Sequence, residues 1–308
     1  MAQDPSVVFV RDGTRVPFPY ASTGEFLLQA KRGAYTTARS VDQDAIFEWE
    51  AHVERMAKSS KLMMDREESE SADGIGDGAA RHSDITSAES LRPLLLDTVA
   101  EAMTAFKAGH EGQEMKITVL ITWTSDDYEI STLVVPLGNR PAQPVKAQVG
   151  GKPRKNALAK DSEWTRQRLS LEKQKPADVN EIILMDEDGG LFEGTQTNFY
   201  AVQDGAVYTA EEGILEGTVR KMILEVCERE GVPIRREPPN IKSIGDWQGA
   251  FISSTSRLLL PLAEIDYRPA EGAALEKRVF EPCPLVDRLE GLILSEFREL
   301  STRIIQSS

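Results

Sequence analysis

The chain has 308 residues, of which 40% are hydrophobic and 28% are charged, a composition typical of a soluble globular protein. Its formal net charge of −14 argues against a nucleic-acid-binding protein, since phosphate backbones require clustered lysines and arginines, and the sequence has no such cluster. No apolar run approaches the roughly 18 residues that cross a bilayer, and Met1–Val10 lacks the pattern of a secretory signal. A cytoplasmic protein of two domains is therefore expected, without nucleic-acid or membrane partners.

The first half of the chain shows helical and strand patterns around one polar insertion. Apolar residues at helical spacing predict helices over residues 45–64 and 91–108. The acidic segment 65–90 between them is rich in Ser and Gly and has almost no large apolar residue, so it cannot bury enough surface to offset its ordering entropy. We expect it to be a mobile surface loop. Residues 115–123 and 128–137 have the apolar runs of paired strands, joined by a short polar turn.

Proline and glycine residues between Gly138 and Lys155 predict a domain boundary, with an N-terminal domain over residues 1–145 and a C-terminal domain over residues 146–308. The second half contains short strands, hairpin turns and few helices, which favours an α+β fold over a doubly wound sheet. The expected strands are 181–185, 198–203, 206–209 and 250–254, and the expected helices include 219–227 and 284–300.

The cysteines and histidines do not form the pattern of a metal site or of a disulfide framework. Cys227 and Cys283 are isolated thiols without CxxC spacing and are expected to be reduced and inert. His52, His82 and His110 are too few and too scattered for a metal triad. No metal is therefore expected.

The most specific pattern lies between Glu193 and Arg220. It contains Glu193, the pair Asn198–Phe199, Thr209, and the apolar-x-Gly-x-x-Arg ending that starts at Leu215. Each part alone has an ordinary structural explanation, such as an edge charge, a turn cap or the start of a helix. Together, and in this order, they resemble the class IV aminotransferase family.

The resemblance extends over roughly Tyr20 to Ile265. Three further motifs carry it, namely GAYT with Tyr35, HVERM with Arg55, and FISSTS with Thr255. The stretches GAYTTARS and AKDSEWTRQRLSLEK resemble the branched-chain aminotransferase-like proteins of plants. The family implies the D-amino acid aminotransferase-like fold, with a small N-terminal α/β domain and a larger, β-rich C-terminal pseudobarrel domain. It also implies a homodimer and the cofactor pyridoxal 5'-phosphate (PLP).

PLP chemistry requires a lysine that holds the cofactor's aldehyde as a Schiff base and moves the substrate's α-proton. Lys160 lies upstream of Glu193 at about the separation that the family keeps, and it is the expected catalytic residue. Lys155 is the nearest alternative, and the weaker ones are Lys152, Lys173 and Lys175. The family usually has an Asn shortly after this lysine, whereas Trp164 occupies the neighbourhood here, so the substrate side of the site is expected to differ.

The resemblance also assigns the cofactor contacts. Glu193 is expected beside the ring nitrogen, where a carboxylate keeps the ring protonated. Thr218 and Val219 open a helix whose free N–H groups can bind the phosphate, and Arg55 can clamp it. The remaining expected contacts come from Tyr35, Asn198 and Thr255. Arg166 or Arg168 could meet a substrate carboxylate, although surface salt bridges are the favoured interpretation.

Three functions fit these residues. The favoured one is a transaminase that exchanges an amino group between an amino acid, of the branched-chain L- or D-amino acid type, and a 2-oxo acid. The alternatives are a PLP-dependent lyase resembling aminodeoxychorismate lyase, and a catalytically degenerate scaffold of the same fold. The presence of both Lys160 and Glu193 favours an active enzyme. The pattern does not determine which amino acid is used or its stereochemistry.

Overall fold

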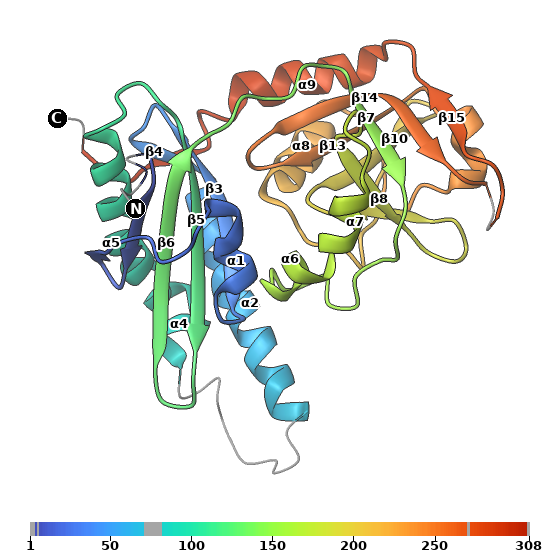
Figure 1. Cartoon of the computed structure of the whole chain (residues 1–308). Helices are drawn as coiled ribbons and strands as arrows, with labels where there is room; N and C mark the ends of the chain where they lie inside the picture. Colours follow the sequence, from blue (N-terminus) through green and yellow to red (C-terminus); the bar gives the residue numbers. More distant parts are fainter. Residues whose placement is uncertain (1–3, 5, 71–81, 270–271, 307–308) are drawn as a thin grey trace. The chain divides into compact units, whose positions relative to one another are not determined.

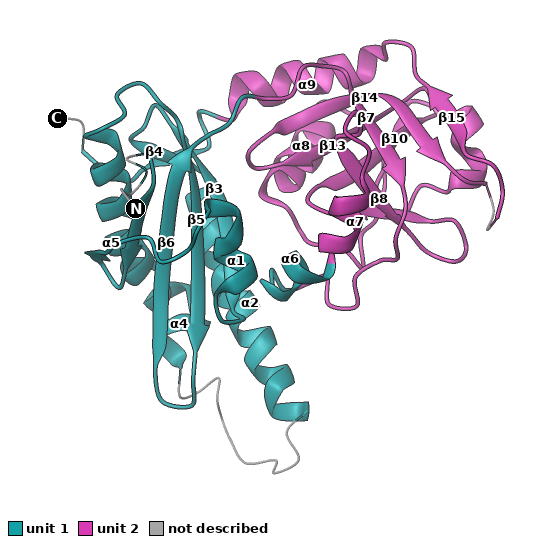
Figure 2. Cartoon of the chain, viewed as in Figure 1, with its two compact units in different colours: residues 1–139, 159–167, 298–308 teal, residues 140–158, 168–297 magenta. Residues whose placement is uncertain are grey.

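The computed structural model describes residues 4, 6–70, 82–269 and 272–306 (Figure 1). The chain divides into two compact units, shown in two colours in Figure 2. The first unit contains residues 1–139, 159–167 and 298–308, and the second contains residues 140–158 and 168–297. The chain thus first leaves the first unit after residue 139 and returns to it twice.

The first return, residues 159–167, is explained by backbone pairing with strand β3 (Ala34–Val41). Asp161 forms an isolated β-bridge with Ala34, and the Tyr35 N–H donates to the Lys160 carbonyl at 2.9 Å. The Arg32 guanidinium binds the Asp161 carboxylate, with Nη2 2.6 Å from Oδ2. These partners are 129 residues apart in the sequence, so local patterns could not predict the return.

An antiparallel sheet of seven strands forms the centre of the first unit, in the order β16-β4-β3-β5-β6-β1-β2. Along β5 the side chains of Ile117, Val119 and Ile121 join one hydrophobic cluster, and Leu120 joins the cluster on the other face, as the alternation of a strand requires. The predicted hairpin is confirmed as β5 and β6. The remaining bounds are β1 (Val8–Arg11), β2 (Thr14–Arg15), β4 (Ala45–Phe47), β5 (Met115–Trp123), β6 (Tyr128–Pro136) and β16 (Ser301–Arg303).

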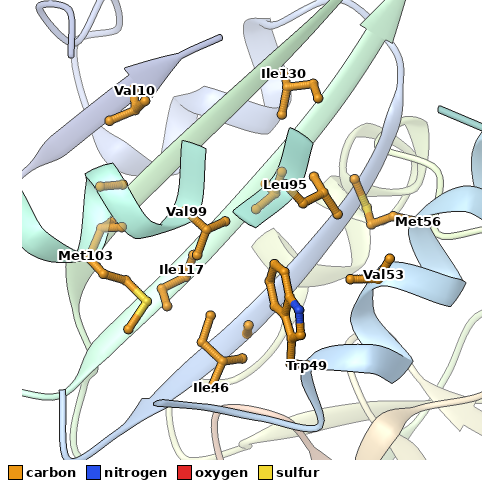
Figure 3. Packing of buried hydrophobic residues seen from close by; sticks show 14 of the residues in the cluster. Val10, Ile46, Trp49, Val53, Met56, Leu95, Val99, Met103, Ile117 and Ile130 are labelled. Atoms are coloured by element: carbon orange, nitrogen blue, oxygen red, sulfur yellow. The ribbon is translucent and has the colours of Figure 1, made fainter. Parts of the chain in front are cut away.

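Helices cover both faces of this sheet. On one face, α2 (Trp49–Glu70), α4 (Ser83–Thr86) and α5 (Ala88–Lys107) bury their apolar side chains against the strands (Figure 3). Val53 and Met56 of α2 and Val99 of α5 belong to this cluster. The opposite face packs against the short helix α1 (Phe26–Gln29), with an aromatic cluster around Phe9 and Phe26. The turn η1 (Thr23–Glu25), which buries no residue, precedes α1. Helix α6 (Glu163–Gln167) also belongs to this unit.

The expectation of a mobile loop over residues 65–90 is wrong for both of its ends. Residues 65–70 continue helix α2, and residues 83–86 and 88–90 are helical in α4 and α5. The extension of α2 has i,i+4 ion pairs, from Lys61 to Asp65 and from Arg66 to Glu70. Glu67 is anchored further by Trp123, whose Nε1 donates to it at 3.1 Å. Residues 71–81 of the expected loop lie outside the described residues.

Six strands of the second unit close into a barrel. The sheet runs β10-β13-β14-β7-β8-β9, and the pairing of Glu193 on β9 with Asn198 on β10 completes the ring. The predicted strand 181–185 is confirmed as β8, and the predicted strands 198–203 and 250–254 are confirmed within β10 and β13. The bounds are β7 (Val145–Val149), β8 (Glu181–Met185), β9 (Leu191–Gly194), β10 (Asn198–Gln203), β13 (Gly249–Ser254) and β14 (Leu258–Tyr267).

Shorter strands and helices extend the barrel. Strand β11 pairs with β10, β12 with β11, and β15 with β14. Helix α8 buries Val219, Met222 and Ile223, the apolar face that the sequence predicts. The bounds are β11 (Ala206–Tyr208), β12 (Ile234–Arg235), β15 (Glu276–Val279), α7 (Leu169–Gln174), α8 (Thr218–Arg229), η2 (Ile241–Asp246) and α9 (Pro284–Glu296).

The described parts of the chain have three further properties. None of their helices combines the length and the apolarity needed to span a bilayer. They contain no group of three or more His, Cys, Asp or Glu side chains arranged to hold a metal ion. Cys227 and Cys283 are both buried and unpaired.

Candidate functional site

Lys160 has its main chain fixed from two sides within the first unit. Its N–H donates to Ser59 Oγ on helix α2 at 3.0 Å, and its carbonyl accepts the hydrogen bond from Tyr35 on β3. Its Nζ lies 4.8 Å from the centre of the Tyr35 ring, within the range of a cation–π contact. Ser59 is fully buried. The ammonium group can therefore move only through rotations of its own side chain, beside the ring of Tyr35.

Asp161, the residue that follows Lys160, also fixes the position of the lysine segment. Its Oδ1 accepts from the Glu163 N–H at 2.9 Å, at the start of α6, and its carboxylate accepts a fork of hydrogen bonds from Arg32. Arg32 also lies 3.6 Å from Glu67 on the extension of α2. The lysine segment is thus held by an ion pair in addition to its main-chain hydrogen bonds.

Arg55 lies on α2 in surroundings that lack a counter-charge. Its Nη2 donates to Thr36 Oγ1 at 2.6 Å and contacts His52 Nδ1 at 3.0 Å. Its Nε is buried without a hydrogen-bond partner, and no carboxylate among the described residues pairs with the guanidinium. Loss of solvent lowers the pKa of Arg55 to about 10. A cation withdrawn from water without a counter-charge is costly, so this position favours an anion.

His52 orients that guanidinium. Its Nδ1 contacts both the Arg55 Nη2 donor and the Thr36 hydroxyl, at 3.0 and 2.7 Å, so Nδ1 acts as the acceptor and the proton resides on Nε2. Nε2 is buried and has no partner. Burial, together with the charges of Arg55 and Lys160, lowers the pKa of His52 well below its usual value. His52 is therefore neutral.

In the second unit, Glu193 is held by two donors at the point where the barrel closes. Its Oε1 accepts from Arg154 Nε at 2.7 Å, and its Oε2 accepts from the Leu215 N–H at 3.0 Å. The side chains of Glu193 and Arg154 are only 4% and 7% exposed. Gly194 donates its N–H to the Thr197 carbonyl at 2.7 Å, and this tight turn places Asn198 opposite Glu193. The carboxylate is thus buried, paired with a guanidinium and fixed in orientation.

Asn198, which pairs with Glu193 between strands β9 and β10, also contacts the segment that leads into helix α8. The Asn198 amide donates to the Leu215 carbonyl at 2.7 Å, and a Cβ built on Gly217 would lie 2.2 Å from Asn198 Oδ1, so only glycine fits there. The first three N–H groups of the helix, which include those of Thr218 and Val219, have no intrahelical acceptor. The hydroxyls of Thr218 and Thr255 lie 3.0 Å apart. This turn has the properties of a phosphate-binding helix start.

The structure therefore places the predicted residues in two groups, each within one unit. Lys160, Tyr35 and Arg55 lie in the first unit. The second unit contains Glu193, Asn198, Thr218, Val219 and Thr255. The roles assigned to these eight residues stay predictions.

The other basic candidates have different surroundings from Lys160. Lys155 is exposed, and Lys152 forms an exposed ion pair with Glu187. Arg166 donates to the Leu28 carbonyl at 2.9 Å and pairs with Glu163, in agreement with the salt-bridge interpretation. Arg168 pairs with Glu172 and donates to the Thr195 carbonyl.

Three functional candidates emerge only from the structure. Arg154 binds Glu193, Ser59 binds the Lys160 N–H, and Arg32 binds Asp161. Ser59 lies three residues after the HVERM motif, but its partner lies 101 residues further along the chain. Arg154 stood in a Pro- and Gly-rich stretch that predicted only a boundary, so no local signal indicated its role.

Comparison with known proteins identifies the family. The model of the family amino-transferase class IV matches residues 33–265. A segment of 94 residues is 31% identical to a putative branched-chain-amino-acid aminotransferase of Methanocaldococcus jannaschii and covers 30% of this chain and 33% of that protein. A segment of 76 residues is 36% identical to a D-alanine aminotransferase of Staphylococcus haemolyticus and covers 24% of this chain and 27% of that protein. The aligned segments thus span a third or less of these two relatives.

Solved structures match almost the whole chain. The branched-chain aminotransferase of Thermoproteus uzoniensis, solved with norvaline, superposes with a TM-score of 0.70 at 18% identity and covers 97% of this chain and 99% of that one. A hypothetical aminotransferase of Mycobacterium tuberculosis, solved in a PLP-bound form, superposes with a TM-score of 0.67 at 17% identity, covering 95% and 99%. This likeness confirms the expected two-part α+β fold with its β-rich pseudobarrel. Because the family model spans most of the sequence, the chain belongs to the class IV aminotransferase family.

Proposed function

We propose that the protein is a PLP-dependent aminotransferase that exchanges an amino group between an amino acid and a 2-oxo acid. The observation that carries the proposal is the position of Lys160, whose main chain is held by Ser59 and Tyr35 while its amine remains beside the Tyr35 ring. Membership of the class IV family supports the same activity.

The residues of the chain fit the chemical groups of PLP. The cofactor needs an amine for its aldehyde, an anion site for its phosphate and an acid beside its ring nitrogen. Arg55, with its buried and unpartnered Nε, and the first turn of α8 supply donors and positive charge for a phosphate. Glu193 supplies a buried carboxylate, and Lys160 supplies the amine.

PLP, when bound, supplies an electron sink that stabilises negative charge at the substrate's α-carbon. Lys160 Nζ would accept and return the substrate's α-proton, and its fixed main chain leaves only side-chain rotation for this movement. The buried Glu193 carboxylate would favour the protonated form of the ring nitrogen. Arg55 and the N–H groups of Thr218 and Val219 would each offer donors to the phosphate.

The substrate class proposed is a branched-chain L-amino acid or a D-amino acid. The curated relatives support both, since they include branched-chain aminotransferases and D-alanine aminotransferases. A panel of L- and D-amino acids, added singly to the PLP-loaded protein, decides between them through loss of the visible absorption band. A homodimer and a cytoplasmic location stay predictions, and sedimentation equilibrium tests the first.

Borohydride reduction followed by peptide mapping tests the role of Lys160. We expect the reduced cofactor on the peptide that contains Lys160, and we expect Lys160→Ala to abolish the label while the control Lys155→Ala retains it. A label on another lysine contradicts the assignment. A protein that stays colourless at saturating PLP contradicts the enzyme proposal as a whole, and pyruvate release from aminodeoxychorismate without a 2-oxo acid indicates the lyase instead.

A further inference from the structure

Arg154 is the buried partner of the carboxylate assigned to the cofactor's ring. Its Nε donates to Glu193 Oε1 at 2.7 Å, and its Nη2 donates to the Ala157 carbonyl at 3.2 Å. Both charged side chains are less than one-tenth exposed. The segment that carries Arg154 leaves β7 through Gly151, whose φ of 77° lies in the left-handed region that favours glycine. Arg154 is held against Glu193 by its hydrogen bonds to that carboxylate and to the Ala157 carbonyl.

The ion pair with Arg154 changes how strongly Glu193 attracts a neighbouring proton. Each carboxylate oxygen already accepts one hydrogen bond, from Arg154 or from the Leu215 N–H, but each has a second lone pair, so the group can still accept from a further N–H donor. The guanidinium neutralises much of the negative potential of the carboxylate at this buried position, because charges interact strongly where water is excluded. A lone buried glutamate would attract a neighbouring proton more strongly.

We propose that Arg154 is a positioning residue that acts through Glu193, fixing the orientation of the carboxylate and weakening its hold on a proton at the ring nitrogen of PLP. The inference rests on the proposed function and deepens it, because it assigns the residue that regulates the electron demand of the bound cofactor. With Arg154 present, the ring nitrogen therefore loses its proton at a lower pH than it would beside Glu193 alone.

PLP labelled with 15N at the ring nitrogen tests this proposal, because the NMR shift of that nitrogen reports its protonation directly. The shift is followed against pH in the wild-type holoenzyme and in Arg154→Gln, which keeps an N–H donor but removes the charge. We expect the midpoint of ring protonation to rise by about one pH unit or more in Arg154→Gln, since a cation has been removed from the neighbourhood of the carboxylate. Arg154→Lys, which keeps the charge, is expected to restore a midpoint close to the wild-type value.

Two further variants separate this effect from a loss of structure. Arg140→Gln removes another arginine of the second unit, which pairs with Glu290 at 2.7 Å, and it is expected to leave the midpoint unchanged. Arg154→Met serves as a second neutral variant if Arg154→Gln does not fold. If the wild type and the neutral variant both bind PLP and have the same midpoint of ring protonation, this inference is wrong and the proposed function is unaffected. A wild-type protein that binds no PLP overturns both this inference and the proposed function.

Discussion

At the residue scale, the surroundings of Arg55 favour an anion beside its guanidinium. Among the described residues its guanidinium binds the neutral partners Thr36 and His52, and its Nε is buried without an acceptor. Folding usually pairs a buried cation with a carboxylate, because desolvation otherwise costs several kcal/mol. The missing counter-charge is therefore most simply supplied by a bound anion.

Arg55→Met is expected to weaken PLP binding about 10- to 100-fold, because a hydrogen bond to a charged group contributes roughly 1.5–3 kcal/mol. The same change is expected to leave the stability of the cofactor-free protein unchanged or higher, since it removes an uncompensated charge. Titration with PLP and thermal unfolding measure the two effects. Arg66→Met, on the exposed side of the same helix, is the control, and equal losses of affinity in both variants would contradict a phosphate role for Arg55.

His52 makes stability depend on pH. The pKa of this buried group is lowered well below its usual 6.5, so below about pH 6.5 the unfolded chain takes up a proton that the folded chain does not. Unfolding is then favoured as pH falls, by up to about 1.4 kcal/mol per pH unit from this residue. Neighbouring titratable groups that face His52 are Arg55 and Lys160, both cationic, and they act in the same direction.

His52→Gln is accordingly expected to flatten the fall in unfolding free energy between pH 7 and pH 5. Urea denaturation of the cofactor-free protein at several pH values measures this dependence of the unfolding free energy on pH. His110→Gln, at a half-buried histidine of the same unit, is the matched control and should keep the wild-type slope more closely. An unchanged slope in His52→Gln would show that His52 is protonated in the folded state.

At the scale of elements, helix α2 positions the lysine segment through one of two adjacent serines. Ser59 and Ser60 are both fully buried, but Ser59 Oγ accepts from the Lys160 N–H at 3.0 Å, whereas Ser60 Oγ has no hydrogen-bond partner. The two residues differ in their hydrogen bonding although their burial is the same.

Ser59→Ala is therefore expected to cost about 1 kcal/mol of stability and to lower kcat, with little effect on the dissociation constant for PLP. Ser60→Ala is expected to be neutral or slightly stabilising, because it removes a buried hydroxyl that has no partner. Chemical denaturation and steady-state kinetics compare the two variants. Equal effects would indicate that α2 contributes only packing and not the position of Lys160.

At the scale of the whole molecule, barrel closure joins the strand that carries Glu193 to the start of helix α8. The β9–β10 pairing sets Asn198 opposite Glu193, and Asn198 in turn occupies the space over Gly217 at the start of α8. The carboxylate and the helix start are thus coupled through one amide side chain.

Gly217→Ala is expected to displace Asn198 and to weaken PLP binding, because the added Cβ would lie 2.2 Å from Asn198 Oδ1. The double variant Gly217→Ala with Asn198→Ala should lose less affinity than the sum of the two single changes, since the clash is removed. Gly291→Ala in α9, where nothing lies within 4 Å, is the control and should leave PLP binding intact. If the losses of PLP affinity were additive, the contact between Gly217 and Asn198 would not contribute to PLP binding.

The sequence by itself determined the elements whose signals are local, and the family. The hairpin of β5 and β6, strand β8 and the buried face of α8 follow from periodicity, because side-chain alternation and helical spacing are properties of neighbouring residues. The ordered motif from Glu193 to Arg220 indicated the class IV family, which the family comparison confirmed.

Only the tertiary structure decided the contacts between distant segments. Local composition suggested a loop where α2 continues, because the anchor at Trp123 lies 56 residues beyond Glu67. The return of residues 159–167 to the first unit, the bond from Lys160 to Ser59 and the pairing of Arg154 with Glu193 join residues 39 or more positions apart. Such pairings depend on how whole elements pack, and no short stretch of sequence contains that information.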